Sequence, residues 1–204
     1  MAVNCAVIYY SATGTTYELA RAVEEGARSA GAEVRLRKVR ELAPDEAIAT
    51  NEGWAAHRLE TRDVPEATLD DLEWANAIIF GTPTRYGLPA AQLKQFIDSS
   101  GPLWGAGKLI NKFGSAFTTT ATTHGGQETT IVSLNTTFYH WGSIIVPPGY
   151  ADPIQFQAGN PYGASFVSNN GTLKPDDVAR AAARFQGKRV VDVTAQFLNG
   201  ASQG

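Results

Sequence analysis

Short runs of apolar residues alternate along the chain with longer segments in which apolar residues recur at helical spacing. Five runs are too short for helices and are predicted to be strands, at residues 3–9, 33–39, 75–81, 113–120 and 143–148. The third run is apolar throughout, which is typical of a central strand covered on both faces, whereas the second alternates and favours a sheet edge. Strands that alternate with helices predict βαβ units around a parallel sheet, an open doubly wound α/β fold.

Four segments of helical period are predicted to cover this sheet, at residues 16–30, 89–99, 128–139 and 175–198. Residues 41–70 mix proline, charge and two short apolar groups without a sustained period, so we expect an insertion there. We expect loops at residues 82–89, 101–112 and 147–174, where glycine, proline and polar residues interrupt any period.

Composition narrows the class of protein. With 204 residues, 43% of them hydrophobic, the chain can bury one sizeable core, and we expect a single domain over residues 1–204. A net charge of −3 offers no basic field to nucleic acid or an anionic membrane. No apolar run is long enough to span a membrane and the N-terminal residues do not resemble a signal peptide, so we expect a cytoplasmic protein. Cys5, the only cysteine, is expected to pack in the core.

The loop after the first predicted strand is built from small polar residues and leads directly into a helix. It contains Ser11, Ala12, Thr13, Gly14, Thr15 and Thr16. Unpaired N–H groups and the helix dipole at such a position can hold a phosphate without lysine. The spacing matches neither GxGxxG nor the GK[ST] of a P-loop, which disfavours NAD and ATP as the tightly held ligand. The alternative is an ordinary strand-to-helix turn with threonine caps.

Two further loops, after the third and fourth predicted strands, are also rich in threonine and glycine. In an open doubly wound sheet the carboxyl ends of the strands meet at one edge, where ligands bind. We therefore expect the three loops to converge on one site. The sequence offers no Ser-His-Asp arrangement and no metal-ligand spacing.

These loops carry a resemblance to a known family. SATGTT resembles the [ST]-x-T-G-x-T phosphate loop with which flavodoxin-like proteins hold FMN. The stretches IIFGTPTRYGLPAAQLKQFID, GPLW, GGQETTI, VPPGY and NPYGAS are together similar to the WrbA family, the NAD(P)H:quinone oxidoreductases first described as tryptophan-repressor-binding proteins. The resemblance covers most of the chain and is weak only in residues 41–70. It implies a flavodoxin-like five-stranded sheet of order 2-1-3-4-5 and a homotetramer made of two dimers.

The resemblance also implies roles for individual residues. The loop at 11–16 would wrap the FMN phosphate. Pro83, Thr84, Arg85, Tyr86 and Gly87 would lie against the isoalloxazine ring, where the Arg85 cation could stabilise negative charge. The third loop would follow the ribityl chain and pyrimidine side, with Thr119, Thr120, Ala121, Thr122, Thr123, His124, Gly125 and Gly126. His140 would lie near a flavin in its own or a neighbouring subunit, and Trp104 would stack a quinone substrate.

Two departures from the family leave questions open. The third loop is one residue longer than usual, so which of its threonines contact FMN, and whether His124 belongs to the site, stay undecided. Thr13 replaces an aromatic residue that meets the nicotinamide nucleotide, so the preference for NADH or NADPH is also open. His57, in the expected insertion, is predicted to be exposed, and Trp54, Trp74 and Trp141 are predicted to serve packing.

The predicted function is FMN-dependent two-electron reduction of quinones to hydroquinones by NADH or NADPH, with hydride transfer through the flavin in a ping-pong sequence. The alternative is a flavodoxin-type carrier of single electrons, which the modest charge and the long segments at 101–112 and 147–174 disfavour. We expect those segments either to enclose a substrate space or to form subunit contacts. A flavin reductase or azoreductase shares the same chemistry and stays open. A role as a repressor's partner has no support in the residues.

Overall fold

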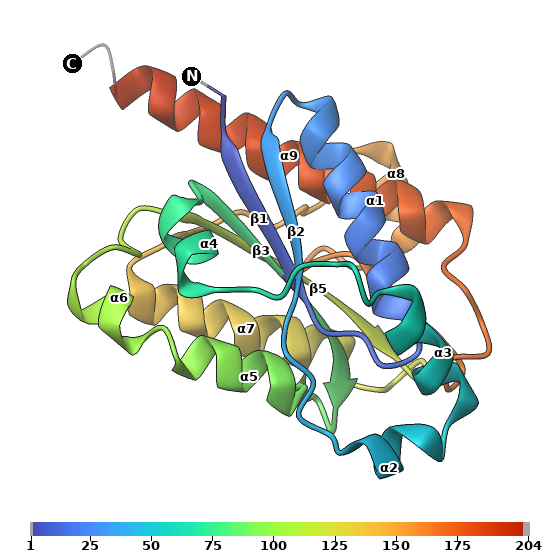
Figure 1. The fold of residues 1–204 in the computed structure, drawn as a ribbon. Coiled ribbons are helices and arrows are strands. Elements are labelled where there is room, and N and C mark those ends of the chain that lie inside the picture. The colour runs from blue at the N-terminus through green and yellow to red at the C-terminus, as the bar shows by residue number, and fades with distance from the viewer. Residues whose placement is uncertain (1, 202–204) are drawn as a thin grey trace.

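The computed structural model describes residues 2–201 and contains a parallel sheet in the order β2-β1-β3-β5-β6 (Figure 1). Neighbouring strands along this path are all parallel. The strands are β1 (Asn4–Tyr9), β2 (Glu33–Lys38), β3 (Ala77–Arg85), β5 (Phe113–Thr120) and β6 (Ile144–Ile145). This is the predicted order 2-1-3-4-5, with the second predicted strand at an edge and the third in the centre, so the predicted fold class is confirmed.

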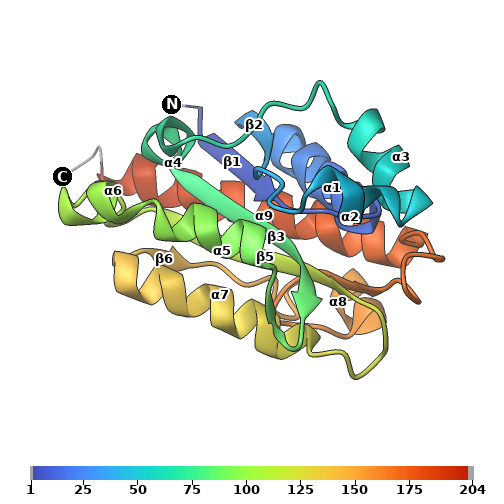
Figure 2. The same cartoon turned by 60° about the horizontal axis from the view of Figure 1, so that its bottom comes forward.

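Helices cover both faces of the sheet (Figures 1 and 2). One apolar layer lies under α1 and α9 and includes Ile79 of β3, while the other lies under α4, α5 and α7 and includes Ile78 and Phe80. Successive strand residues point to opposite faces, so the uninterrupted apolar run of β3 supplies both layers. The helices are α1 (Thr15–Ser29), α2 (Asp45–Ala49), α3 (Glu52–Glu60), α4 (Leu69–Trp74), α5 (Ala91–Asp98), α6 (Gly101–Gly105), α7 (Gln127–Trp141), α8 (Pro153–Ala158) and α9 (Asp177–Ala201).

The segment expected to be an irregular insertion contains three short helices, α2, α3 and the start of α4. Their lengths of five, nine and six residues give too few turns for a detectable apolar period. The first two lie beyond the carboxyl ends of β1 and β2, at the right of Figures 1 and 2. The inserted residues therefore stand at the edge of the sheet where ligands bind in this class of fold.

Residues 82–89, expected to be a loop, form a β-hairpin. β3 continues to Arg85 and returns as β4 (Leu88–Pro89), which pairs antiparallel with it. The two turn residues, Tyr86 and Gly87, have φ of 56° and 80°, the left-handed pair that a tight hairpin turn requires. The following helix begins at Ala91, so Pro89 belongs to the hairpin rather than to the helix.

Regular structure also occurs in the two other segments expected to be loops. α6 lies in residues 101–112, and residues 147–174 contain α8 and β7 (Ser165–Val167), which pairs with the carboxyl end of β5. The predicted strand at 143–148 shrinks to Ile144–Ile145, because Pro147 and Pro148 have no N–H with which to extend the ladder.

Glu41 anchors the inserted helices to the sheet. Its carboxylate accepts hydrogen bonds from the Tyr10 hydroxyl at 2.9 Å, Trp54 Nε1 at 3.1 Å and Gln92 Nε2 at 2.8 Å. Burial opposes the charge of Glu41, but these donors and the Ala43 backbone N–H outweigh it and hold the pKa of Glu41 below its usual range. One carboxylate thus joins α3 and α5 to Tyr10, the residue that follows β1.

Two expectations for single residues have opposite outcomes. Cys5 is fully buried among apolar side chains, as predicted. His57 was predicted to be exposed, which is wrong. Its side chain is only 5% exposed, because the Tyr17 ring of α1 covers it, with 5.4 Å between the two ring centroids.

Within residues 2–201, none of the helices combines the length and apolar character needed to cross a bilayer.

Candidate functional site

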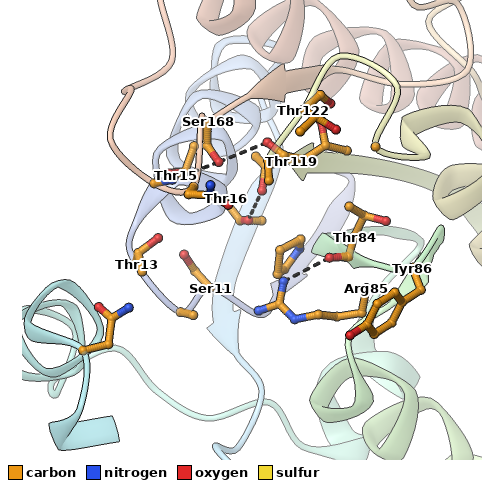
Figure 3. A pocket seen from close by; sticks show the side chains of 18 residues that line it. Ser11, Thr13, Thr15, Thr16, Thr84, Arg85, Tyr86, Thr119, Thr122 and Ser168 are labelled. Atoms are coloured by element: carbon orange, nitrogen blue, oxygen red, sulfur yellow. Dashed lines mark hydrogen bonds between the residues drawn. The ribbon is translucent and has the colours of Figure 1, made fainter.

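The carboxyl ends of β1, β3 and β5 surround a pocket of about 650 Å³ (Figure 3), a size typical of small-molecule sites. The predicted convergence of three loops is therefore present in the structure. The residues that line the pocket are Ser11, Ala12, Thr13, Thr15, Thr16, Asn51, Pro83, Thr84, Arg85, Tyr86, Thr119, Thr120, Ala121, Thr122, Gly125, Ser168, Asn170 and Gly171.

The phosphate loop, residues 11–16, joins β1 to α1 and leaves hydrogen-bond donors free. Gly14 precedes α1 with φ 96°, and no side chain caps the helix. The Ser11 Oγ instead accepts a hydrogen bond from the Gly14 N–H at 3.1 Å, which tightens the turn. The first-turn N–H groups of a helix have no partners within the helix, so here they remain available to a ligand.

A buried hydroxyl supports a phosphate at this position. Thr15 is 4% exposed and its Oγ1 has no hydrogen-bond partner, although buried polar atoms are normally paired. The neighbouring Thr16 Oγ1 lies 2.8 Å from Thr119 Oγ1, which ties the phosphate loop to the third loop. An uncapped helix start beside an unpaired hydroxyl fits the phosphate of FMN, which would accept hydrogen bonds from both.

The hairpin forms the second wall of the pocket. Thr84 Oγ1 accepts hydrogen bonds from the Gly87 N–H at 3.1 Å and from Thr130 Oγ1 of α7 at 2.9 Å. Figure 3 shows the Arg85 side chain extending from the hairpin toward Ser11. Its guanidinium donates to the Thr84 carbonyl at 3.0 Å and forms no ion pair with a carboxylate among the described residues. Arg85 therefore brings an uncompensated positive charge to the pocket.

The third loop packs tightly against this hairpin. A Cβ atom on Gly126 would lie 2.7 Å from the Gly87 Cα, so the contact requires glycine. Thr120 Oγ1 donates to the Thr122 carbonyl at 2.8 Å and accepts from Gln127 Nε2 at 3.1 Å. Of the threonines that the sequence left undecided, Thr119, Thr120 and Thr122 line the pocket and Thr123 does not.

A fourth segment reaches the pocket from within residues 147–174, for which the sequence left open whether they enclose a substrate or form subunit contacts. Residues 168–174, here called the cover segment, follow β7 and bring Ser168, Asn170 and Gly171 to the phosphate end. Both the N–H and the Oγ of Ser168 donate to the Thr120 carbonyl, at 2.7 Å and 3.0 Å. Asn51, just before α3, is a further unpredicted lining residue. The Asn-Asn-Gly sequence at 169–171 predicts a turn, but it does not indicate that the turn lies beside the pocket.

The remaining predicted residues lie outside the lining. Gly14, Gly87, Thr123, His124 and Gly126 belong to the loops around the pocket without facing it. His140 is exposed in the last turn of α7, and Trp104 of α6 is 57% exposed and donates through Nε1 to the His140 carbonyl at 2.9 Å. α7 starts at the pocket, and at about 1.5 Å per residue its 15 residues place His140 roughly 20 Å away. Figure 2 shows α6 at that far end.

Comparisons with known proteins agree with a flavin site. The family model described as NADPH-dependent FMN reductase matches residues 4–156. A Deinococcus radiodurans protein named NAD(P)H dehydrogenase (quinone) is 49% identical over 197 residues, which is 96% of this chain and 98% of the relative. A Sinorhizobium fredii protein of the same name is 45% identical over 199 residues, covering 95% and 98%.

Solved structures give the same picture. The crystal structure of a flavodoxin, WrbA-like protein from Agrobacterium tumefaciens has a TM-score of 0.67 and 28% identity, covering 96% of this chain and 99% of that one. A flavodoxin from the domain Archaea has a TM-score of 0.62 at 18% identity over 94% and 99% of the two chains. That second likeness concerns the fold alone.

Proposed function

The chain belongs to the NADPH-dependent FMN reductase family, and we propose that it uses bound FMN to reduce quinones to hydroquinones, two electrons at a time, with NADH or NADPH as reductant. The resemblance to the tryptophan-repressor-binding flavoproteins that the sequence motifs indicated is confirmed by these relatives and by the WrbA-like structure. The quinone and the nicotinamide nucleotide are inferred from the relatives' names, whereas the geometry of the site supports the phosphate of FMN.

The observation that carries the proposal is the phosphate end of the pocket. An uncapped α1, the buried and unpaired Thr15 hydroxyl and the glycine turn at Gly14 offer a phosphate several donors at once. The pocket then continues from these residues to the hairpin at Pro83–Tyr86. A phosphate loop without the GxGxxG spacing fits a flavin mononucleotide better than a dinucleotide held by a pyrophosphate loop.

Bound FMN would supply the hydride-accepting and hydride-donating chemistry. The chain supplies binding and electrostatics. Arg85 would favour negative charge on the ring side of the pocket, because its guanidinium has no carboxylate partner among the described residues. Thr84 holds the hairpin at a fixed distance from α7 through Thr130, which keeps the two walls in place. No nucleophilic side chain is needed in this mechanism.

An anaerobic titration tests the function. Purified protein receives FMN, then NADH or NADPH, and then benzoquinone, while flavin absorbance is recorded. The proposal expects bleaching by a nicotinamide nucleotide and full recovery on adding the quinone. Absence of FMN binding would overturn the argument at the phosphate loop, and binding without reduction by either nucleotide would favour a flavodoxin-type electron carrier.

The proposal extends to the assembly. Trp104, Ile110, Tyr139 and His140 form an exposed patch at the far end of α7, with Ile110 58% and Tyr139 72% exposed. We call it the α7-end patch. Since His140 and Trp104 are far from the pocket of their own chain, the proposal places them in the pocket of a second copy, within a homotetramer in the cytoplasm. Large exposed apolar groups of this kind commonly mark protein interfaces.

Light scattering after gel filtration tests this assembly, with a Tyr139→Lys variant to disrupt the α7-end patch. The proposal expects a tetramer for the wild type, and smaller species with weaker quinone reduction but retained FMN binding for the variant. A monomeric wild type with full activity would contradict the shared site. Phe156→Lys, at an aromatic residue of α8 that is 71% exposed and lies outside the pocket lining, is the matched control for charge at a surface aromatic.

A further inference from the structure

Two side chains from distant parts of the chain stand next to Gly14 in the phosphate loop. A Cβ atom on Gly14 would lie 3.3 Å from Nδ1 of His57 and 3.5 Å from Nζ of Lys174. His57 belongs to α3, and Lys174 ends the cover segment ahead of α9. Neither lines the pocket. Both therefore act from behind the backbone of the loop rather than by direct contact with a ligand.

The charges around Lys174 leave a positive excess at this point. Glu18 of α1 pairs with Lys174 at 2.9 Å and with Arg180 at 2.7 Å. One carboxylate thus faces two cations. An excess positive charge behind a loop of free N–H groups strengthens the attraction for an anion in that loop.

The surroundings of His57 favour its neutral form in the free protein. His57 Nδ1 donates to Glu60 Oε2 at 3.2 Å, and the Tyr17 ring covers it from α1. Burial lowers the pKa of His57; Glu60 partly offsets this, while the cations Lys174 and Lys38 of β2 lower the pKa further. Tyr9 of β1 stacks on Tyr17. The other charged groups that line the same cavity as His57 are Arg40, Glu41, Asp45, Arg58 and Glu66.

Resting on the proposed use of FMN, we propose that His57 and Lys174 are positioning residues for the FMN phosphate. Lys174 adds fixed positive charge behind the phosphate loop, and His57 takes up a proton from solvent when the phosphate binds. The backbone N–H groups of the loop would then contact the phosphate directly, and the charges of Lys174 and protonated His57 would attract it from the other side of the loop. The sequence alone suggests only the N–H groups and the helix dipole.

The direction of the pH dependence follows from linkage. A phosphate dianion near His57 favours the imidazolium and raises the pKa of His57 above its value in the free protein. Proton binding and phosphate binding therefore reinforce one another equally. FMN affinity is greatest at low pH, falls as pH rises between the free and bound pKa values of His57, and is constant above both.

The test compares wild type with His57→Gln, which cannot carry a charge and can still bond to Glu60. Dissociation constants for FMN and for riboflavin, which lacks the phosphate, are measured by flavin fluorescence from about pH 5.5 to about pH 8.5, a range that brackets the ordinary histidine pKa. The FMN phosphate itself ionises near pH 6, and this contribution cancels in the ratio of the two proteins.

We expect the wild type to lose up to about tenfold in FMN affinity relative to His57→Gln as pH rises through this range, since a nearby opposite charge shifts a pKa by about one unit and each unit is a factor of ten in the binding constant. Riboflavin affinity shows no such difference. Parallel FMN profiles for the two proteins would overturn the proposal. Failure of wild type to bind either flavin would instead overturn the proposed function.

Lys174→Met tests the fixed charge, with Lys188→Met as its matched control. Both lysines are about half exposed and each pairs with one carboxylate, Glu18 or Asp192, but only Lys174 is near the loop. We expect Lys174→Met to bind FMN about threefold more weakly than wild type at every pH, and we expect added salt to reduce this difference. Riboflavin binding by Lys174→Met, and FMN binding by Lys188→Met, should not change. Equal FMN affinities for both variants would contradict the role of Lys174.

Should His57→Gln bind neither flavin, calorimetry on wild type decides. Measuring FMN binding in buffers with different ionisation enthalpies gives the number of protons taken up. Uptake near neutral pH with FMN and none with riboflavin supports the proposal, and no uptake with FMN overturns it.

Discussion

The phosphate loop and the two segments that enclose it differ in how they are built. The loop at 11–16 is fixed by residues that are neighbours in sequence, with the Gly14 N–H bonded to Ser11 and α1 starting at Thr15. Its enclosure comes from α3, about forty residues later, and from the cover segment, more than 150 residues later. The first region is a local motif of a strand and a helix, whereas the second exists only through long-range contacts.

Substitutions in these two regions should therefore lower FMN affinity to different extents. Changes within the loop should act on the donors that face the ligand and so weaken FMN binding strongly. Changes in the enclosing segments should shift the position of the loop, and they should therefore weaken FMN binding less. The following substitutions, in order of decreasing effect on FMN affinity, test whether that ranking holds.

Gly14→Ala should have the largest effect, about 30-fold weaker FMN binding. An alanine at φ 96° costs about 1–2 kcal/mol, and its Cβ would press on His57, so the loop relaxes and its N–H groups move. Fluorescence titration measures the affinity. Gly31→Ala is the control, because Gly31 has φ 84° with nothing near its Cβ; it should lose similar stability and keep full affinity. Equal affinities in both variants would falsify the assignment of the loop.

Thr15→Val should weaken FMN binding about tenfold, since it removes a hydroxyl that can bond to a charged phosphate. The free protein should keep its stability or gain slightly, because the lost Oγ1 has no partner. The control is Thr194→Val on α9, whose Oγ1 donates to the Val190 carbonyl at 2.7 Å. That variant should unfold at lower urea concentration with unchanged FMN affinity. A destabilised Thr15→Val would mean that its hydroxyl serves the fold.

The local motif could be predicted from the sequence and the enclosure could not, for identifiable reasons. Alternating strands and helices predicted a doubly wound parallel sheet, and the family resemblance implied its strand order. Small residues between a strand and a helix predicted an anion site at 11–16. His57 was expected to be exposed because nothing in the sequence of its short polar helix indicates that the Tyr17 ring covers it. Ser168 and Asn170 look like loop residues in the sequence, and the hydrogen bonds of Ser168 to the Thr120 carbonyl hold their segment at the site.

The resemblance adds residues that a single chain does not bring together. His140 and Trp104 follow family motifs, yet they lie at the opposite end of α7 from the pocket. A sequence motif can indicate that residues belong to the same kind of site, but it does not indicate whether one subunit or two subunits form that site. The resemblance therefore predicts that these two residues belong to a site, and in the proposed tetramer that site is in a second copy of the chain.

Glu41→Gln should loosen the first enclosing segment and weaken FMN binding about fivefold. The change keeps the shape but removes the charge that Tyr10, Trp54 and Gln92 share, at a cost of about 1–2 kcal/mol in the free energy of unfolding. Because the folded pKa of Glu41 is lowered, its stabilisation is fully present above the unfolded pKa of about 4.3 and is lost as pH falls through the lower folded value.

Urea titrations of wild type and Glu41→Gln near pH 7 and near pH 3 measure this stabilisation, with the gap expected to shrink at the lower pH. Glu24→Gln is the control, since Glu24 pairs with Arg21 and Arg28 on α1 away from the inserted helices. It should lose some stability and keep its FMN affinity. A Glu41→Gln protein with unchanged affinity would show that α3 does not support the phosphate loop.

Ser168→Ala should have the smallest effect, about threefold weaker FMN binding. Its Oγ donates to the Thr120 carbonyl at 3.0 Å and accepts from the Gly171 N–H at 3.2 Å, but the Ser168 N–H still bonds to Thr120 at 2.7 Å. The cover segment is therefore loosened rather than released, at about 1 kcal/mol for the lost hydroxyl bonds. Ser143→Ala removes a comparable bond to the Leu109 carbonyl at 2.9 Å outside the pocket, and should lose similar stability with no loss of affinity. If Ser168→Ala instead weakens FMN binding as much as Gly14→Ala does, the cover segment and the phosphate loop form one cooperative site, and the distinction between a local motif and its enclosure does not hold in this protein.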